Sequence, residues 1–111
     1  MASQLSNYRE AFSSASDYYG NQAIRFRGVH KSQETKYRKL EALSKIMERH
    51  AAELAPPSGL SLEILAREAG KTEAFEGRIV SANSLRPYLN TLRLQINLDL
   101  TLTGGSFIMV S

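Results

Sequence analysis

Hydrophobic residues in the last quarter of the chain follow a helical spacing. Residues 84–96 read SLRPYLNTLRLQI. Their large apolar side chains recur every three or four positions, which places them on one face of an α-helix. Ser84 is a suitable N-cap because its hydroxyl can accept a hydrogen bond from an unpaired backbone amide, and Pro87 would fall in the first turn. The pattern predicts a helix at 84–96 with a buried face made of Leu85, Leu89, Leu92 and Ile96.

The pattern then changes from a helical spacing to alternation. Leucines at positions 98, 100 and 102 alternate with polar residues, as in a half-buried strand. Gly104-Gly105 suits the positive φ angles of a tight hairpin turn, and residues 106–110 are mostly apolar again. The sequence predicts a hairpin at 98–110 with two apolar pairs on one face, Leu102 opposite Phe107 and Leu100 opposite Met109.

The first twenty residues carry a narrow apolar stripe and predict a helix at 1–20, which Gly20 would end. A stripe this short is marginal on its own, so the helix must pack on the rest of the chain or on a second copy of itself. Both alternatives stay open, and the expected domains are 1–22 for this helix and 23–111 for the remainder. The stripe consists of Leu5, Tyr8, Phe12, Ala15 and Tyr19.

The middle of the chain predicts one strand and two helices. Residues 24–29 alternate apolar and basic side chains, which is typical of an edge strand. The other elements are a helix at 33–54 capped by Ser32, a helix at 61–69 capped by Ser61, and a connection at 71–83. The order strand, helix, helix, helix, hairpin predicts an α+β fold. The fold class expected is a winged helix-turn-helix with an extra N-terminal helix and a C-terminal β-hairpin wing.

Composition narrows the possible functions. The chain has 111 residues, enough for one modest domain, and contains no cysteine. Its two histidines, His30 and His50, are not in a metal-binding spacing, so neither a metal nor another cofactor is expected. No apolar run could cross a bilayer, which predicts a soluble cytoplasmic protein with no membrane partner. Residues 20–50 hold eight basic and three acidic residues, a bias that suits phosphate contact or simply a solvated helix face.

Three segments resemble the effector domain of the OmpR/PhoB-type winged helix-turn-helix family. HKSQETKYRKLEALSKIM at 30–47 is similar to the first helix of that family, and SANSLRPYLNTLRLQI at 81–96 is similar to its recognition helix. LTGGSFIMV at 102–110 is similar to its wing, although Thr103 stands where the family usually has an arginine. The resemblance implies a bacterial regulator of transcription that binds DNA.

The first functional hypothesis is therefore a DNA-binding transcriptional regulator, with double-stranded DNA as its partner and a homodimer as a further possibility. The side chains of Arg86, Asn90 and Arg93 recur at i, i+4 and i+7 on the polar face of the helix, and their geometry matches the major-groove edges of guanine and adenine. The backbone contacts expected are Ser84 and Thr91 on that helix, Thr103 and Ser106 beside the turn, and Arg25, Arg27 and Lys31.

The second hypothesis is a protein-interaction module, such as an anti-activator or an assembly factor, because charge is sparse on the helix at 84–96 and on the hairpin. An enzyme is not expected, since no nucleophile has an organised base and no glycine-rich phosphate loop follows a strand.

Overall fold

In the part of the chain that the structure describes, four α-helices make up most of the residues and three very short strands form a small sheet. The computed structural model describes residues 2–54, 59–96, 100–103 and 106–109. In chain order the elements are α1 (Ala2–Phe26), α2 (Lys31–Arg49), the 3₁₀ turn η1 (Ala51–Leu54), β1 (Leu60–Ser61), α3 (Leu62–Gly70), the 3₁₀ turn η2 (Glu73–Phe75), α4 (Ala82–Ile96), β2 (Leu100–Thr103) and β3 (Ser106–Met109).

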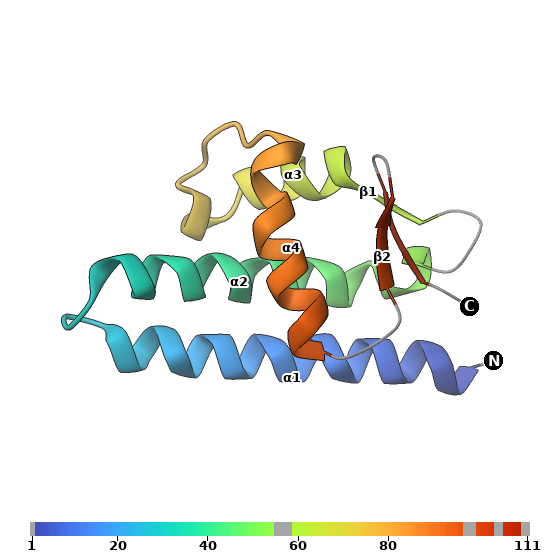
Figure 1. Cartoon of the computed structure of the whole chain (residues 1–111), viewed down its shortest axis with the longest axis horizontal. Coiled ribbons are helices and arrows are strands. Elements are labelled where there is room, and N and C mark those ends of the chain that lie inside the picture. Colours follow the sequence, from blue (N-terminus) through green and yellow to red (C-terminus); the bar gives the residue numbers. More distant parts are fainter. Residues whose placement is uncertain (1, 55–58, 97–99, 104–105, 110–111) are drawn as a thin grey trace.

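The two longest helices, α1 and α2, lie side by side as an antiparallel pair and set the long axis of the molecule (Figure 1). Helix α4 crosses this pair, and α3 lies beyond α2 near the first turn of α4. A single core joins all four helices, since buried residues from each of them belong to one apolar cluster. The apolar stripe predicted for the N-terminal helix is part of this core: Tyr8, Phe12, Ala15 and Tyr19 are buried within the chain, while the side chain of Leu5 lies outside the described region.

The strand predicted at 24–29 is wrong, because α1 continues to Phe26 and the chain then turns through residues 27–29. The ring of Phe26 stacks on Tyr37 of α2, with centroids 5.8 Å apart, and Tyr37 also stacks on Tyr19. Ile24, which the alternation would have buried, is 60% exposed. Packing of aromatic rings between the helices therefore outweighs a local alternation of only a few residues.

Gly20 does not end the first helix. It lies inside α1 at a point where a Cβ atom would come within 2.6 Å of Glu41 Oε2 on α2. The glycine thus leaves room for the carboxylate of Glu41 against α1. The domain boundary expected after residue 22 falls inside α1.

These findings overturn the predicted fold class, an α+β winged helix-turn-helix with an extra N-terminal helix and a hairpin wing. The fold is mainly helical, and α1 belongs to the core instead of being added to it. The strands are two to four residues long, in the order β1-β3-β2. Strand β3 pairs with β1 on one edge and β2 on the other and also contacts η1, so the strands close one end of the helical core. The antiparallel register of β2 and β3 places Leu102 opposite Phe107 and Leu100 opposite Met109, which confirms the two predicted pairs. The turn expected at Gly104-Gly105 lies outside the described residues.

Helix boundaries differ from the predicted ones mainly at the caps. Ser61 caps α3 as predicted, accepting a hydrogen bond from the amide of Glu63 at 3.2 Å. In α2, however, His30 is the N-cap instead of Ser32, because its Nδ1 accepts from the amide of Gln33 at 3.3 Å. The helix predicted at 33–54 ends at Arg49, and the separate turn η1 follows.

Gly70, the last residue of α3, has no room for a side chain. A Cβ atom there would collide with the backbone carbonyl oxygen of Arg78 and would lie 3.6 Å from Val80 Cγ2. Backbone cannot rotate away as a side chain can, so we expect Gly70→Ala to lower the free energy of unfolding by about 1–3 kcal/mol. Urea denaturation followed by circular dichroism measures this value.

Gly20→Ala is the matched control, because its new Cβ would meet only the flexible end of Glu41. Alanine is the better helix former by about 1 kcal/mol, so this variant should be neutral or more stable than the parent. If Gly20→Ala and Gly70→Ala lowered the free energy of unfolding equally, the steric explanation would be contradicted.

Candidate nucleic-acid interface

Helix α4 is capped one turn earlier than predicted. It begins at Ala82, and Ser81 Oγ accepts a hydrogen bond from the amide of Ser84 at 3.2 Å. The expected N-cap, Ser84, lies inside the first turn and donates its hydroxyl to the carbonyl of Ser81 at 2.8 Å. Pro87 consequently falls within the helix, where it supplies no N–H to the carbonyl of Asn83.

The buried face of α4 is the predicted one. Leu85, Leu89 and Leu92 are fully buried, and Ile96 packs partly against the same core. With 100° between successive residues, the opposite ridge of the helix carries Asn83, Pro87, Asn90 and Leu94.

One flank of α4 carries two arginines. Arg86 and Arg93 lie 20° apart around the helix axis and are both half-buried. The Arg86 guanidinium donates through Nε to Asn83 Oδ1 at 3.2 Å, which orients it along the outer surface of the first turns.

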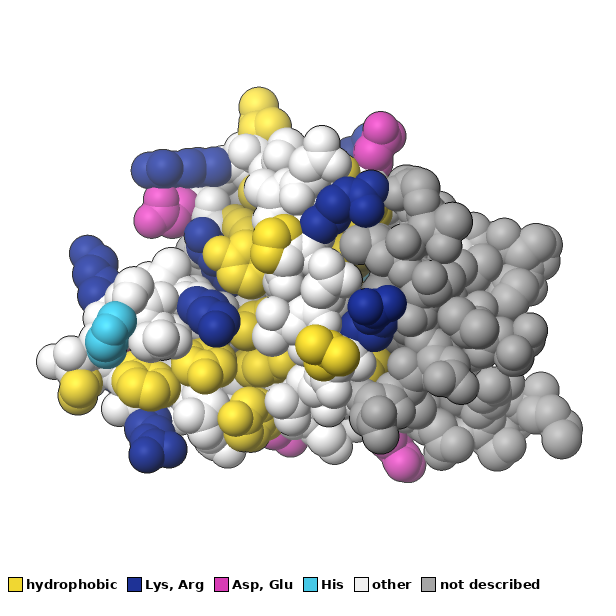
Figure 2. Space-filling view, viewed as in Figure 1, with side chains coloured by type: hydrophobic (Ala, Val, Ile, Leu, Met, Phe, Trp, Pro, Cys, Tyr) yellow, Lys and Arg dark blue, Asp and Glu magenta, His cyan; other side chains and the backbone are white. Residues whose placement is uncertain are grey.

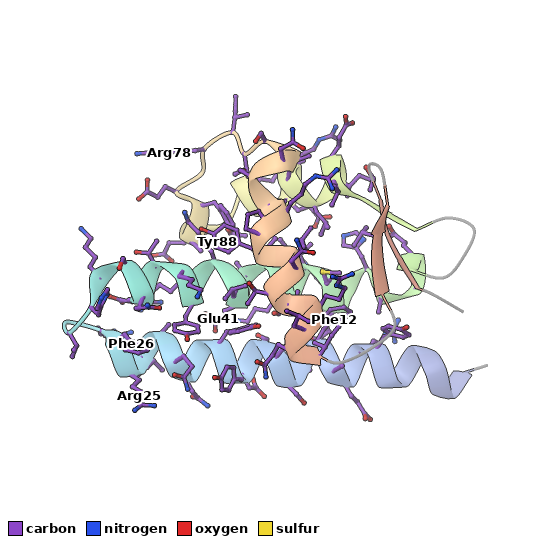
Figure 3. All side chains as sticks on the ribbon, in the orientation of Figure 1. Phe12, Arg25, Phe26, Glu41, Arg78 and Tyr88 are labelled. Atoms are coloured by element: carbon purple, nitrogen blue, oxygen red, sulfur yellow. The ribbon has the colours of Figure 1, made fainter. Side chains whose placement is uncertain are left out.

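The other flank of α4 carries an aromatic and cationic cluster formed by Lys39, Phe75 and Tyr88. Phe75 of η2 meets Tyr88 of α4 edge to face, with ring centroids 6.4 Å apart. Lys39 of α2 places its ammonium nitrogen 5.4 Å from the Phe75 centroid and 5.8 Å from the Tyr88 centroid, within the range of cation–π attraction. Figure 3 shows Tyr88 beside α4, where that helix passes over α2.

The surface around α4 is positively charged. The helix contains no acidic residue between Ala82 and Ile96. Figure 2 shows Lys and Arg side chains around it, while the visible Asp and Glu side chains lie toward the edge of the molecule. Several other cations are neutralised by glutamates: Arg38 by Glu34, Lys45 by Glu41, Arg49 by Glu68 and Arg78 by Glu76. Within the described part of the chain Lys39 and Arg93 form no ion pair, so their charge remains available to an anionic partner.

The structure brings together five of the ten residues that the sequence suggested as DNA contacts. All five lie on α4, with Asn90 near the outer ridge and Ser84 and Thr91 on the flank opposite the arginines. Thr91 also donates its hydroxyl to the carbonyl of Pro87 at 3.0 Å. Thr103 and Ser106 face each other across the β2–β3 pair.

The remaining three suggested contacts lie apart from α4. Arg25 is in the last turn of α1, and in Figure 3 its side chain points away from α4. Lys31 is the first residue of α2, at the end of the helix pair where α1 turns into α2. Arg27 lines a broad groove of about 1150 Å³ that runs along another side of α2 and also contains Arg38 and Lys45.

The sequence did not predict that Lys39, Phe75 and Tyr88 form a cluster. Tyr88 could have been placed on the flank of α4 from the helical spacing alone. Phe75 comes from a connection without periodicity, so no sequence signal links it to Lys39 of α2.

A second polar cluster joins the end of α2 to α3. His50 contacts Glu53 through Nδ1 at 2.9 Å and Glu68 through Nε2, and Arg49 also pairs with Glu68 at 3.3 Å. The hydrogen bond to Glu53 is the largest effect, and together with the charge and hydrogen bond of Glu68 it outweighs partial burial and raises the pKa of His50 above its ordinary value of 6.5. Among the described residues, no group of three or more metal-ligating side chains is placed to hold an ion.

This cluster gives the protein a pH-dependent stability. A raised pKa in the folded state stabilises folding fully below pH 6.5, and the stabilisation is lost as the pH rises through the folded pKa. The side chains are partly exposed, so we expect the free energy of unfolding to fall by only about 0.5–1 kcal/mol between pH 6 and pH 9. Urea denaturation across this range measures the effect. His50→Gln should remove most of the pH dependence. If the free energy of unfolding of that variant still changed with pH as in the wild type, the pH dependence would belong to another group.

No helix in the described part of the chain is long and apolar enough to cross a membrane. No protein-family model matches the chain, and no curated protein and no solved structure shows a significant similarity to it.

Proposed function

We propose that this protein binds double-stranded DNA through α4 and regulates transcription. The observation that carries the proposal is the outer surface of α4, which is exposed, contains no acidic residue and has cations on both flanks. Binding to DNA depends largely on cations that replace the counterions of the phosphates. Three groups on this surface can also recognise bases: the amide of Asn90 and the guanidinium groups of Arg86 and Arg93.

The shape of α4 is compatible with this role. An α-helix with its side chains is about 10–12 Å wide, and the major groove of B-DNA is about 12 Å wide. Arg86 and Arg93 are seven residues apart, which is about 10 Å along the helix axis, so both can reach the same groove. The leucines on the opposite face anchor α4 in the core.

Fluorescence anisotropy with labelled duplexes of random sequence, measured at several salt concentrations, tests the proposal. We expect binding at low salt and a linear fall of log K with log salt, with a slope of about −0.9 for each phosphate contact. Absence of binding to any duplex at low salt would overturn it.

Leu94 supports a second candidate, a protein-interaction module. Its side chain is 76% exposed and lies on the outer ridge of α4, where a protein partner would gain from burying it. The titrations at several salt concentrations distinguish the two candidate functions. A surface that binds a protein through Leu94 is not expected to bind duplexes of every sequence with a steep salt dependence.

A further inference from the structure

Lys39 supplies a cation on the Tyr88 flank of α4, and two aromatic rings lie next to its ammonium group. Three separate elements meet there, since Lys39 comes from α2, Phe75 from η2 and Tyr88 from α4. Phe75 is buried and Tyr88 half-buried, so both rings are held by the core. The ammonium nitrogen lies 5.4 and 5.8 Å from the two ring centroids.

This arrangement orders a side chain that is normally flexible. A free lysine loses rotamer freedom when it contacts a phosphate, and this loss weakens binding. The rings of Phe75 and Tyr88 restrict Lys39 beforehand, while cation–π attraction leaves its N–H groups able to donate. No carboxylate among the described residues pairs with Lys39, so its charge is not neutralised in the free protein.

The position of Lys39 complements that of the arginines. Arg86 and Arg93 lie on one flank of α4, and Tyr88 with Lys39 lies on the other. A helix that fills the major groove has one phosphate backbone beside each flank.

We propose that Lys39, positioned by Phe75 and Tyr88, contacts a backbone phosphate of one DNA strand while Arg86 and Arg93 face the groove and the other strand. This inference rests on the proposed DNA binding through α4. Lys39 strengthens binding to all sequences alike, because a phosphate contact carries no base information.

The experiment is the same anisotropy titration, carried out with four variants on a random duplex. Lys39→Gln should weaken binding and flatten the slope of log K against log salt by about 0.9, the value for one lost phosphate contact. Lys45→Gln is the matched control on the same helix, because Lys45 is paired with Glu41 and lines the groove on another side of α2. It should leave both affinity and slope at the wild-type values.

Tyr88→Phe and Tyr88→Leu test the role of the ring. Tyr88→Phe keeps the aromatic face and should bind like the wild type. Tyr88→Leu keeps the charge of Lys39 but releases it, so the affinity should fall while the slope changes less than in Lys39→Gln. Circular dichroism melting curves establish that each variant is folded at the temperature of the titration.

The outcomes separate the two proposals. If the wild type binds no duplex, the proposed function fails. If the wild type binds but Lys39→Gln has the same slope and affinity as Lys45→Gln, the phosphate contact of Lys39 is overturned and DNA binding through α4 stands. If Tyr88→Leu binds as tightly as Tyr88→Phe, positioning by the ring is overturned.

Discussion

Replacing Phe12 by alanine is expected to lower the free energy of unfolding by about 3–5 kcal/mol, the largest stability effect predicted for a single substitution in this protein. Phe12 is fully buried on α1 and belongs to the apolar core to which every helix contributes. The substitution removes most of a large apolar side chain and leaves a cavity that the surrounding helices can fill only in part. Urea denaturation of the purified variant measures the loss.

Ile24→Ala provides the control on the same helix. Ile24 is 60% exposed, so its truncation should change the free energy of unfolding by less than about 0.5 kcal/mol. If the two variants were equally stable, α1 would not be part of the core and the description of the fold as one helical unit would be wrong.

Replacing Arg93 by alanine is expected to cost about 1–3 kcal/mol of binding free energy on a selected DNA sequence and to relax specificity at one base pair. Arg93 lies on the flank of α4 beside Arg86, and Asn90 lies next to both on the outer side of the helix. Arg86→Ala and Asn90→Ala should therefore act in the same way at neighbouring base pairs. Because these substitutions leave the core face of α4 unchanged, the free energy of unfolding of each variant should differ from that of the wild type by less than about 0.5 kcal/mol.

Titrations on the selected duplex and on random duplexes distinguish base contacts from phosphate contacts. Arg25→Ala is the matched control, since Arg25 is also an arginine near the end of a helix, but it is exposed and points away from α4. Its affinity should equal that of the wild type on both duplexes. If Arg25→Ala lost as much binding affinity as Arg93→Ala, the DNA-binding surface would lie elsewhere on the molecule.

The parts of the fold that the sequence predicted correctly are those with a sustained period. The buried face of α4 extends over Leu85, Leu89 and Leu92, and a helix is the only regular structure that brings these positions together. Ser61 is predictable as a cap because a serine there precedes a short run of periodically spaced apolar residues. The length of α1 was not predictable in this way, because Gly20 is a poor helix former and its contact with the Glu41 side chain depends on how α1 and α2 pack.

The candidate site was predictable only as far as a single helix determines it. The spacing of Arg86, Asn90 and Arg93 specifies their common side on any helix. The association of Lys39 with Phe75 and Tyr88 depends on how α2, η2 and α4 meet, and that is decided by packing between distant parts of the chain. For the same reason the sequence grouped Arg25 and Lys31 with α4, although the structure places them at other parts of the helix pair.

The pairing of β1 with β3 has a consequence for the order in which the protein folds as it is synthesised. Helices α1 and α2 are neighbours in sequence, and their contacts require no residue after Arg49. Leu60 of β1, in contrast, pairs with Phe107 of β3, and the segment between them contains α3, η2 and α4. Contacts between close neighbours in sequence form sooner than contacts that close a long loop. The segment that carries the proposed DNA-binding helix is therefore fixed at both ends only after Phe107 has left the ribosome.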